Sequence, residues 1–249
     1  MPATSTHKHP DGRTITFTEA SHKYEDGQGG RYQSVTTWLK QFFKPFDAPR
    51  MAARVAKRDG REVADVVAEW NNKRDTACEF GTRTHEIAEA VLLQQTAPHQ
   101  PRDERETRAF FLATDYAETL RTWANENGGQ VYVERVVADP ANLLAGTIDL
   151  QVDFADCTWL IDWKTNASLT KSYGKGRGPI KHLDDSNRTK YGLQLSTYET
   201  IIREHYNVNG PVFRRLVHID HDGGRNFIDL PSFAEEVAAM LEARSPANA

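Results

Sequence analysis

Cysteine is scarce in this chain, whose 249 residues include only Cys78 and Cys157. Two thiols are too few for a disulfide framework or for a cluster held by four thiolates. No apolar run is long enough to span a membrane. The stretch from Met1 to Arg13 lacks the apolar segment of a secretory signal, and its acidic Asp11 and few arginines argue against a mitochondrial transit peptide. These absences favour a soluble protein that is not secreted.

A strongly positive charge is also absent, since 31 lysines and arginines face 35 acids and the net charge is −4. This balance argues against a protein that coats nucleic acid with its whole surface. Affinity for nucleic acid would have to come from local patches. Five basic residues lie between positions 50 and 61 against Asp59 alone, and seven lie between 164 and 190 against Asp184 and Asp185.

The second patch contains a loop in which three glycines alternate with cations. Its basic members are Lys175, Arg177 and Lys181. A glycine-rich basic loop of this kind can close over a phosphate backbone. A flexible surface linker is an equally good interpretation of the same composition.

Two segments predict neighbouring β-strands, because apolar and polar residues alternate in both. The first is Gly146–Asp149, and the second is Ile161–Lys164, in which Asp162 follows Asp149 by thirteen positions. Side chains two apart share a face of a strand. Asp162 and Lys164 therefore point the same way. Asp149 lies opposite an apolar face expected to contain Ile148, Leu150 and Val152.

If these strands pair, Asp149, Asp162 and Lys164 converge at one point. Two carboxylates held together repel one another unless a cation lies between them. Oxygen ligands of this kind suit Mg²⁺ or Mn²⁺. A lysine beside the pair can meet an anionic substrate or hold an attacking water. The constellation predicts a site that cleaves phosphodiesters.

The arrangement resembles the PD-(D/E)XK nuclease superfamily, in its RecB-like exonuclease branch. Gly81–His85 followed by Glu89 is similar to the upstream histidine motif of that branch, and Glu134 is similar to its glutamate motif. Gln194–Tyr198 is similar to its Q-x-x-x-Y motif. The motifs occur in the family's order over residues 81–198, about half of the chain.

Two further features bear on this resemblance. The segment Tyr32–Thr37 is similar to the opening of phage and mitochondrial genome-maintenance-type relatives. Gly146–Asp149 departs from the signature, because Gly-Thr-Ile-Asp replaces Pro-Asp. That replacement is common in the RecB-like branch.

The resemblance implies a catalytic Mg²⁺ or Mn²⁺ held by Asp149, Asp162 and the backbone carbonyl of Trp163. It adds His85 as a further metal ligand, and Glu134 as a direct or water-mediated ligand. Some relatives hold an iron–sulfur cluster, but two cysteines cannot supply its ligands. We therefore expect no such cluster.

The resemblance also implies roles around the metal. Lys164 would orient the attacking water, and Gln194 and Tyr198 would position the DNA backbone by hydrogen bonding and stacking. The expected substrate is DNA that is single-stranded or has a free end, and the expected partners are replication or recombination proteins, without a membrane. The expected location is the cytoplasm of a bacterial or phage-infected cell, with mitochondria left open.

Each motif taken alone has an ordinary interpretation. An Asp-x-Lys on a strand is commonly a solvated face of an edge strand. His85 and Glu89 share a helix face with Leu92 and, by spacing alone, are an ordinary surface pair. Gln194 and Tyr198 at helical spacing fit a core stripe equally well. The order and number of the motifs together favour the nuclease.

Two functions from other classes remain open. A non-catalytic DNA-binding module of a recombination or replication complex would carry the same basic patches, although it has no reason to keep three strained charges together. A metal-dependent hydrolase of a small phosphorylated substrate would share the carboxylates. It would not account for the two patches or the Q-x-x-x-Y element.

The expected fold is α/β, with a restriction-endonuclease-like core of a mixed sheet flanked by helices. We expect one nuclease domain over 1–249, in which 1–128 form a hairpin and helical cap carrying the histidine motif and 129–249 form the core. Ser34 is expected to cap a helix with the apolar stripe Val35, Trp38, Leu39, Phe42 and Phe43. The other expected elements are a hairpin over 13–33, helices over 47–60, 62–73, 76–95, 103–126 and 189–206, strands over 130–138, 143–153, 158–165 and 212–219, and a last helix from Pro231.

Overall fold

The structure is a computed structural model that describes residues 4–219 and 225–244. Its strands are β1 (Thr4–Lys8), β2 (Thr14–Thr18), β3 (Lys23–Asp26), β4 (Arg31–Ser34), β5 (Gln130–Asp139), β6 (Leu144–Asp153), β7 (Thr158–Lys164), β8 (Val212–Ile219) and β9 (Arg225–Asp229). Its helices are α1 (Val35–Lys40), α2 (Ala48–Asp59), α3 (Val63–Leu92), α4 (Glu104–Glu126), α5 (Asn187–His205) and α6 (Ala234–Glu242), with short 3-10 turns at Glu19–Ser21 and Gly178–Ile180. Within the described ranges, no helix combines the length and apolar character that crossing a membrane requires.

The strands form a mixed sheet in which β6 is the branching point. One path runs β1-β2-β3-β4-β6-β7-β8-β9, and β5 pairs with β6 outside this path. The pairs β4·β6 and β7·β8 are parallel, and the other pairs are antiparallel. Along one edge of β6, β4 therefore pairs at residues 144–145 and β7 pairs at residues 150–153.

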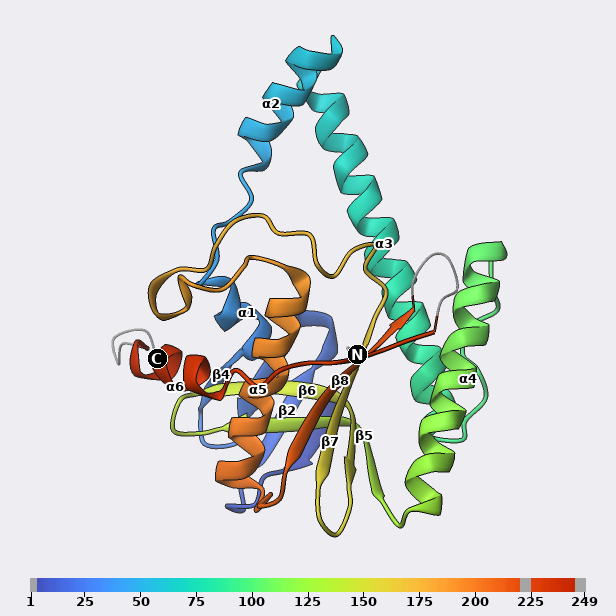
Figure 1. The fold of residues 1–249 in the computed structure, drawn as a ribbon, viewed down its shortest axis with the longest axis vertical. Coiled ribbons are helices and arrows are strands. Elements are labelled where there is room, and N and C mark those ends of the chain that lie inside the picture. Colours follow the sequence, from blue (N-terminus) through green and yellow to red (C-terminus); the bar gives the residue numbers. More distant parts are fainter. Residues whose placement is uncertain (1–3, 220–224, 245–249) are drawn as a thin grey trace.

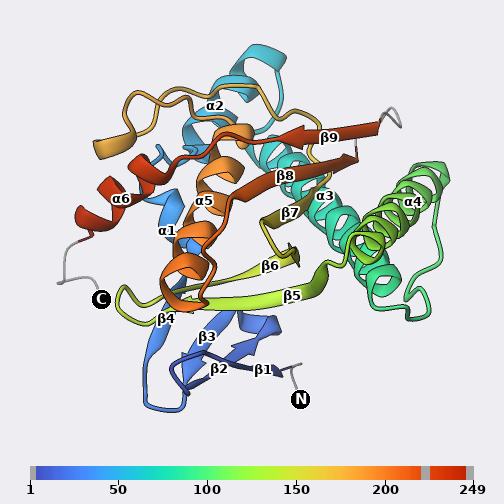
Figure 2. The same cartoon turned by 60° about the horizontal axis from the view of Figure 1, so that its bottom comes forward.

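Helices cover both faces of the sheet, as Figure 2 shows. One apolar cluster joins α1, α5 and α6 to Leu160 and Leu216 of the sheet. The other joins α3 and α4 to Ile161 and Val217, the next residues along the same two strands. Alternate strand residues thus enter opposite layers, as period-two patterning requires. The expected core, a mixed sheet flanked by helices, is confirmed.

The polypeptide before α1 is a meander of four strands, so the single hairpin expected over 13–33 is wrong. The turn expected around Asp26–Gly30 is present, where β3 meets β4. A second reversal joins β2 to β3 through Glu19–Ser21 and His22, whose φ of 49° is left-handed. Residues other than glycine seldom adopt this conformation. Because the reversal is formed by a histidine, the sequence contains no turn signal at this position.

The helical N-termini follow their capping residues. The Ser34 side chain accepts a hydrogen bond from the Thr37 N–H at the start of α1, and Asp47 accepts one from Arg50 at the start of α2. The expected stripe extends beyond α1, because Phe42 and Phe43 follow its last residue. The last helix begins at Ala234, three residues after Pro231.

The two helices expected over 62–73 and 76–95 are one helix of 30 residues, α3. No proline or glycine interrupts the stretch between them, so nothing in the backbone breaks the hydrogen-bond ladder. Figure 1 shows α2 and the first turns of α3 projecting above the sheet as a pair, while the later turns of α3 descend beside it. The helix therefore joins this projection to the sheet.

The apolar face expected to contain Ile148, Leu150 and Val152 is divided between the two layers. Ile148 packs in the layer of α1 and α5, whereas Leu150 and Val152 pack in the layer of α3 and α4. The switch from one layer to the other occurs at Asp149, where the β5·β6 register leaves one position of each strand unpaired. The sheet is distorted at the position of the predicted site.

Candidate active site

Three strands and one helix bring the predicted acids, lysine and histidine to one place. Asp149 lies in the middle of β6, and Asp162 and Lys164 lie at the end of β7. The β6·β7 register ends with Leu150 opposite Ile161, so Asp149 and Asp162 are the next residues of each strand. His85 reaches them from α3, with its Nδ1 3.4 Å from Asp149 Oδ2.

Asp149 is held by the backbone of the neighbouring strand. The Trp163 N–H donates a hydrogen bond of 2.9 Å to Asp149 Oδ2. The carbonyl of Trp163 accepts one of 3.0 Å from Lys164 Nζ. Trp163 thus contributes only backbone atoms to the site, while its side chain is buried in the layer of α3 and α4.

Lys164 carries the positive charge of the cluster. Its Nζ lies 2.5 Å from Asp162 Oδ2 and 4.8 Å from the centroid of the Tyr191 ring. Asp162 is 2% exposed, so this ion pair is shielded from water. The charges of Asp162 and Asp149 raise the pKa of Lys164, although burial acts in the opposite direction. The lysine therefore remains an ammonium at neutral pH.

Glu134 faces this group from β5 with a strained backbone. Its φ is 48°, an uncommon value for a residue with a side chain, and it falls at the unpaired position of the β5·β6 register. Burial, followed by the charges of Asp149, Glu89 and Asp162, raises the pKa of Glu134 to about 9. Strain of this kind persists where the surrounding structure holds a side chain in place.

The other titratable groups of the site are shifted by the same causes. Burial raises the pKa of Asp149, and burial raises that of Asp162 to about 6 against the opposing charge of Lys164. Burial and the nearby lysine charge lower the pKa of His85 to about 4. At neutral pH the imidazole is therefore neutral and able to bind a metal ion.

Gln194 and Tyr198 lie together on α5, but not where a nucleic-acid strand could reach them. The Gln194 Nε2 donates to Tyr198 OH at 3.3 Å and to Asp162 Oδ1 at 3.5 Å. The two side chains are 9% and 3% exposed. The expected stacking of Tyr198 on DNA does not fit this burial. Gln194 instead contacts Asp162, and Tyr198 contacts Gln194.

The basic loop of the second patch is ordered by backbone hydrogen bonds, so its interpretation as a flexible linker is wrong. The Gly176 N–H donates to the Leu183 carbonyl, and the Arg177 N–H donates to the Phe42 carbonyl. Lys175 forms an ion pair of 2.8 Å with Asp184. The other two predicted DNA-binding cations, Arg177 and Lys181, are exposed. The backbone that carries these three cations is therefore hydrogen-bonded to the rest of the protein.

The first basic patch lies on α2. Arg50, Arg54 and Lys57 are exposed at helical spacing along one side of this helix. Arg58 and Arg61 are partly neutralised by Asp59 and by Glu69 of α3, respectively. The projection in Figure 1 therefore carries a basic stripe.

Four further residues of the site were not singled out as functional from sequence. Glu89 adds a carboxyl one turn after His85 on α3, with a pKa raised by burial and by Glu86. Tyr24 of the meander donates or accepts a hydrogen bond of 3.0 Å with Thr147 Oγ1, beside Asp149. The other two, Tyr191 and Asn166, share a hydrogen bond next to Lys164. The signal for Glu89 was its place in the histidine motif, whereas the other three depend on tertiary contacts.

A second acidic group lies at the end of β5, away from Lys164. In the described part of the chain, Asp139, Glu204 and His205 bring ligand atoms within 4.8 Å of one another. The Asp139 carboxylate already accepts hydrogen bonds from the Ala141 and Asn142 N–H groups and from the Asn142 amide. These bonds account for its burial as a turn cap.

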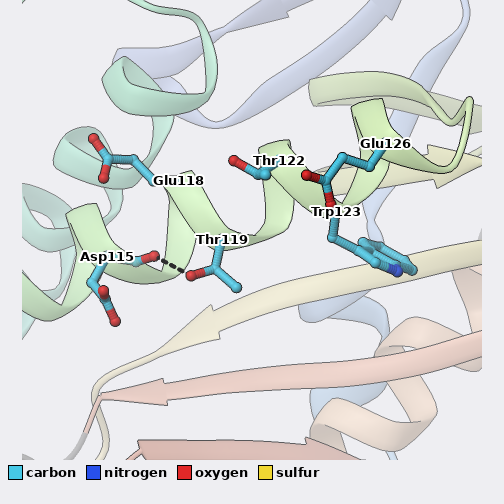
Figure 3. Close-up of a pocket in the computed structure, with 6 residues that line it drawn as sticks. All are labelled: Asp115, Glu118, Thr119, Thr122, Trp123 and Glu126. Carbon is cyan, nitrogen blue, oxygen red and sulfur yellow. Dashed lines mark hydrogen bonds between the residues drawn. The ribbon is translucent and has the colours of Figure 1, made fainter.

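A shallow surface depression of about 400 Å³ lies on α4 (Figure 3). All of its lining residues come from that helix: Asp115, Glu118, Thr119, Thr122, Trp123 and Glu126. The Thr119 hydroxyl donates to the Asp115 carbonyl, an intrahelical bond that leaves the helix intact. None of the predicted catalytic residues lines it.

The donor set around Lys164 fits a divalent metal ion. Four carboxyl groups come from Glu89, Glu134, Asp149 and Asp162, and His85 adds a neutral nitrogen. Burial and, after it, the charges of Asp149, Glu89 and Asp162 raise the pKa of Glu134 despite the opposing charge of Lys164, so a cation among these acids would be favoured. Carboxylate oxygens with one imidazole suit Mg²⁺ or Mn²⁺.

Comparison with known proteins identifies the family. The profile of the PD-(D/E)XK nuclease superfamily matches residues 38–245. Among solved structures, the chain is similar to a "Putative exonuclease" from Eubacterium rectale, with a TM-score of 0.41 and 11% identity over 87% of this chain and 79% of that one. The curated proteins contain no significant match. Because the profile spans well over half of the chain, this protein belongs to the PD-(D/E)XK nuclease superfamily, whose members hydrolyse phosphodiesters with divalent metal ions.

Proposed function

We propose that this protein is a deoxyribonuclease of the RecB-like branch that degrades DNA from free ends, prefers single strands and acts in recombination, repair or replication. One observation carries the proposal. Asp149, Asp162 and Lys164 converge where the β6·β7 pairing ends, and the Trp163 backbone binds both Asp149 and Lys164. Replication or recombination proteins are its proposed partners.

The metal ligands in this proposal are Asp149, Asp162, the Trp163 carbonyl and His85, with Glu134 as a direct or water-mediated ligand. Their chemistry favours Mg²⁺ or Mn²⁺. When bound, the ion supplies Lewis-acid activation of water and neutralises charge on the phosphate. The neutral imidazole of His85 supports its role, because a protonated ring could not bind a metal.

Lys164 is proposed to orient the attacking water and to stabilise negative charge that develops on the phosphate. Its raised pKa keeps the required positive charge at neutral pH. Gln194 is proposed to orient Asp162, the carboxylate to which it donates. Tyr198 then acts through Gln194, because its ring is buried.

The two basic patches are the proposed DNA-binding surfaces. Lys175, Arg177 and Lys181 lie on an ordered loop that follows the catalytic strand, and the α2 stripe lies on the projection joined to His85 by α3. Lysine and arginine contacts to phosphate carry no base information, so binding should be independent of sequence. A single strand with a free end is the substrate that the family resemblance favours.

Digestion of defined substrates tests the proposal. Purified protein is incubated with Mg²⁺ or Mn²⁺ and with linear or closed-circular DNA, each in single- and double-stranded form. The proposal predicts that linear single strands are degraded fastest and that closed single-stranded circles resist. Rapid cleavage of the circles would contradict the exonuclease assignment. Cleavage of a small phosphodiester but not of DNA would favour the hydrolase of small substrates instead.

A further inference from the structure

The positive end of Lys164 is enclosed on three sides by contacts within the protein. Asp162 Oδ2 lies 2.5 Å from Nζ, and the Trp163 carbonyl accepts its hydrogen bond at 3.0 Å. The third contact is the face of the Tyr191 ring, whose centroid is 4.8 Å away. This distance is within the range of a cation–π interaction, which strengthens when the cation is shielded from water.

The Tyr191 ring is itself held in place. Its hydroxyl donates a hydrogen bond to the side-chain oxygen of Asn166, two residues beyond Lys164. The backbone carbonyl of Asn166 is 2.7 Å from Nε2 of the buried His218 on β8. These bonds connect α5 to the end of β7 and to β8. The ring is therefore fixed against the lysine from a different element.

Two of the three contacts of Lys164 involve atoms proposed as metal ligands, namely the Asp162 carboxylate and the Trp163 carbonyl. Only the Tyr191 ring contacts the ammonium without competing for the metal ion. A neutral ring face attracts a cation without withdrawing its proton or forming a fixed hydrogen bond. The ring therefore takes none of the three N–H donors of the ammonium. Two of them are directed at Asp162 and the Trp163 carbonyl, and the third can serve a phosphate or a water.

We infer that Tyr191 is a positioning residue for the reaction, whose ring face holds the Lys164 ammonium at the site. This inference rests on the proposed function of Lys164. The aromatic face of Tyr191, rather than its hydroxyl, holds the ammonium in place. The hydroxyl fixes the ring through Asn166, and the packing of α5 provides further support.

Two substitutions distinguish the contribution of the ring face from that of the hydroxyl. Tyr191→Phe keeps the face and removes the bond to Asn166, whereas Tyr191→Leu removes both. Single-turnover cleavage of linear DNA should stay within about twofold of wild type for Tyr191→Phe. It should fall about tenfold for Tyr191→Leu, a loss that corresponds to about 1.4 kcal/mol of activation free energy. DNA affinity should be unchanged in both.

Tyr206 offers a matched control at the end of α5. Arg135 lies over its ring at 5.1 Å from the centroid, and its hydroxyl accepts a hydrogen bond from the Ala138 N–H. Tyr206→Leu therefore removes a half-buried ring, a cation contact and a hydrogen bond far from Lys164. It should lower the melting temperature about as much as Tyr191→Leu does, with cleavage unchanged.

A second measurement does not depend on cleavage. Amine acylation followed by mass spectrometry reports how freely Lys164 reacts, and the rate should rise severalfold in Tyr191→Leu and remain at the wild-type value in Tyr191→Phe. Equal labelling of Lys164 in all three proteins would overturn the inference, as would a loss of cleavage in Tyr191→Phe equal to that in Tyr191→Leu. An inactive wild-type protein would refute the proposed function, whereas the labelling would still test the contact.

Discussion

The Tyr198 ring lies where a side chain at position 146 would stand: a Cβ on Gly146 would be 2.5 Å from Tyr198 Cε1 and 2.6 Å from its hydroxyl. The glycine of Gly-Thr-Ile-Asp is thus required by the tyrosine of the Q-x-x-x-Y element. Through Gln194 the same tyrosine contacts Asp162. Two motifs recognised separately in the sequence are one packed unit in the structure.

Gly146→Ala should therefore destabilise the protein by about 1–3 kcal/mol, because the methyl group overpacks a buried site. It should also lower cleavage, since displacement of Tyr198 moves Gln194 away from Asp162. Urea unfolding measures the first effect. On a Tyr198→Ala background the added methyl should cost nothing further. Gly27→Ala, at an exposed turn with open space around the Cβ, is the matched control and should change neither quantity.

Removal of the His85 imidazole should lower activity strongly in Mg²⁺, because a metal ligand is lost. Excess Mn²⁺ should restore part of the activity of His85→Ala, since Mn²⁺ binds sites of this kind more tightly than Mg²⁺ does. Titration of each metal against cleavage rate checks this. An identical metal dependence in variant and wild type would show that His85 is an ordinary helix residue and not a metal ligand.

The raised pKa of Glu134 predicts how stability changes with pH when metal is removed. Between pH 4.5 and about 9 the unfolded chain has lost this proton, whereas the folded protein retains it. The folded state then binds more protons, so the free energy of unfolding falls as pH rises. Above pH 6.5 the shifts of His85 and Asp162 no longer contribute, since their folded pKa values are about 4 and about 6.

Urea unfolding in EDTA at pH 6.5, 7.5 and 8.5 tests this expectation. The wild-type protein should become less stable at each step, and Glu134→Gln should remove most of the decline because its amide does not titrate. A wild-type stability that rises over this interval would show that Glu134 is ionised in the metal-free fold.

Neutralising the three loop cations together should weaken DNA binding equally for all sequences, because phosphate contacts do not distinguish bases. The slope of log affinity against log salt should decrease by about 2 for a single strand. Fluorescence anisotropy over a salt series measures both effects. The variant set is Lys175→Ala, Arg177→Ala and Lys181→Ala. The control set replaces three exposed cations of the N-terminal strands and consists of Lys8→Ala, Lys23→Ala and Arg31→Ala. An equal effect from this control set would show a general charge effect instead.

Periodic patterns predicted the elements that carry the site. The strands from β5 to β8 lie within a residue or two of their expected bounds, and Ser34 and Asp47 cap the helices expected of them. Both kinds of signal are local, since alternation and capping depend only on neighbouring residues. Because alternation places side chains on one face or the other, the sequence also predicted which side chains of β6 and β7 lie close together.

The remaining features depend on contacts between distant segments. The β2–β3 reversal is formed by His22 in a left-handed conformation, and β9 at the sheet edge was not expected. In the sequence Tyr191 is one aromatic residue of a predicted helix, and only the fold brings the Lys164 ammonium against its ring. The burial of Tyr198 likewise follows from the missing side chain of Gly146 on a separate strand. No local pattern encodes these relationships.

Cleavage of linear DNA by alanine variants of the central acids and lysine tests the proposed site most directly. Asp149→Ala, Asp162→Ala and Lys164→Ala should each abolish cleavage in Mg²⁺ or Mn²⁺. The metal-free melting temperature should be unchanged or slightly higher for the two acid variants, because each acid is buried among like charges. It should fall for Lys164→Ala, because that change leaves Asp162 buried without its cation. EDTA should abolish wild-type cleavage in the same assay. A wild-type rate in any one of the three variants would contradict the assignment.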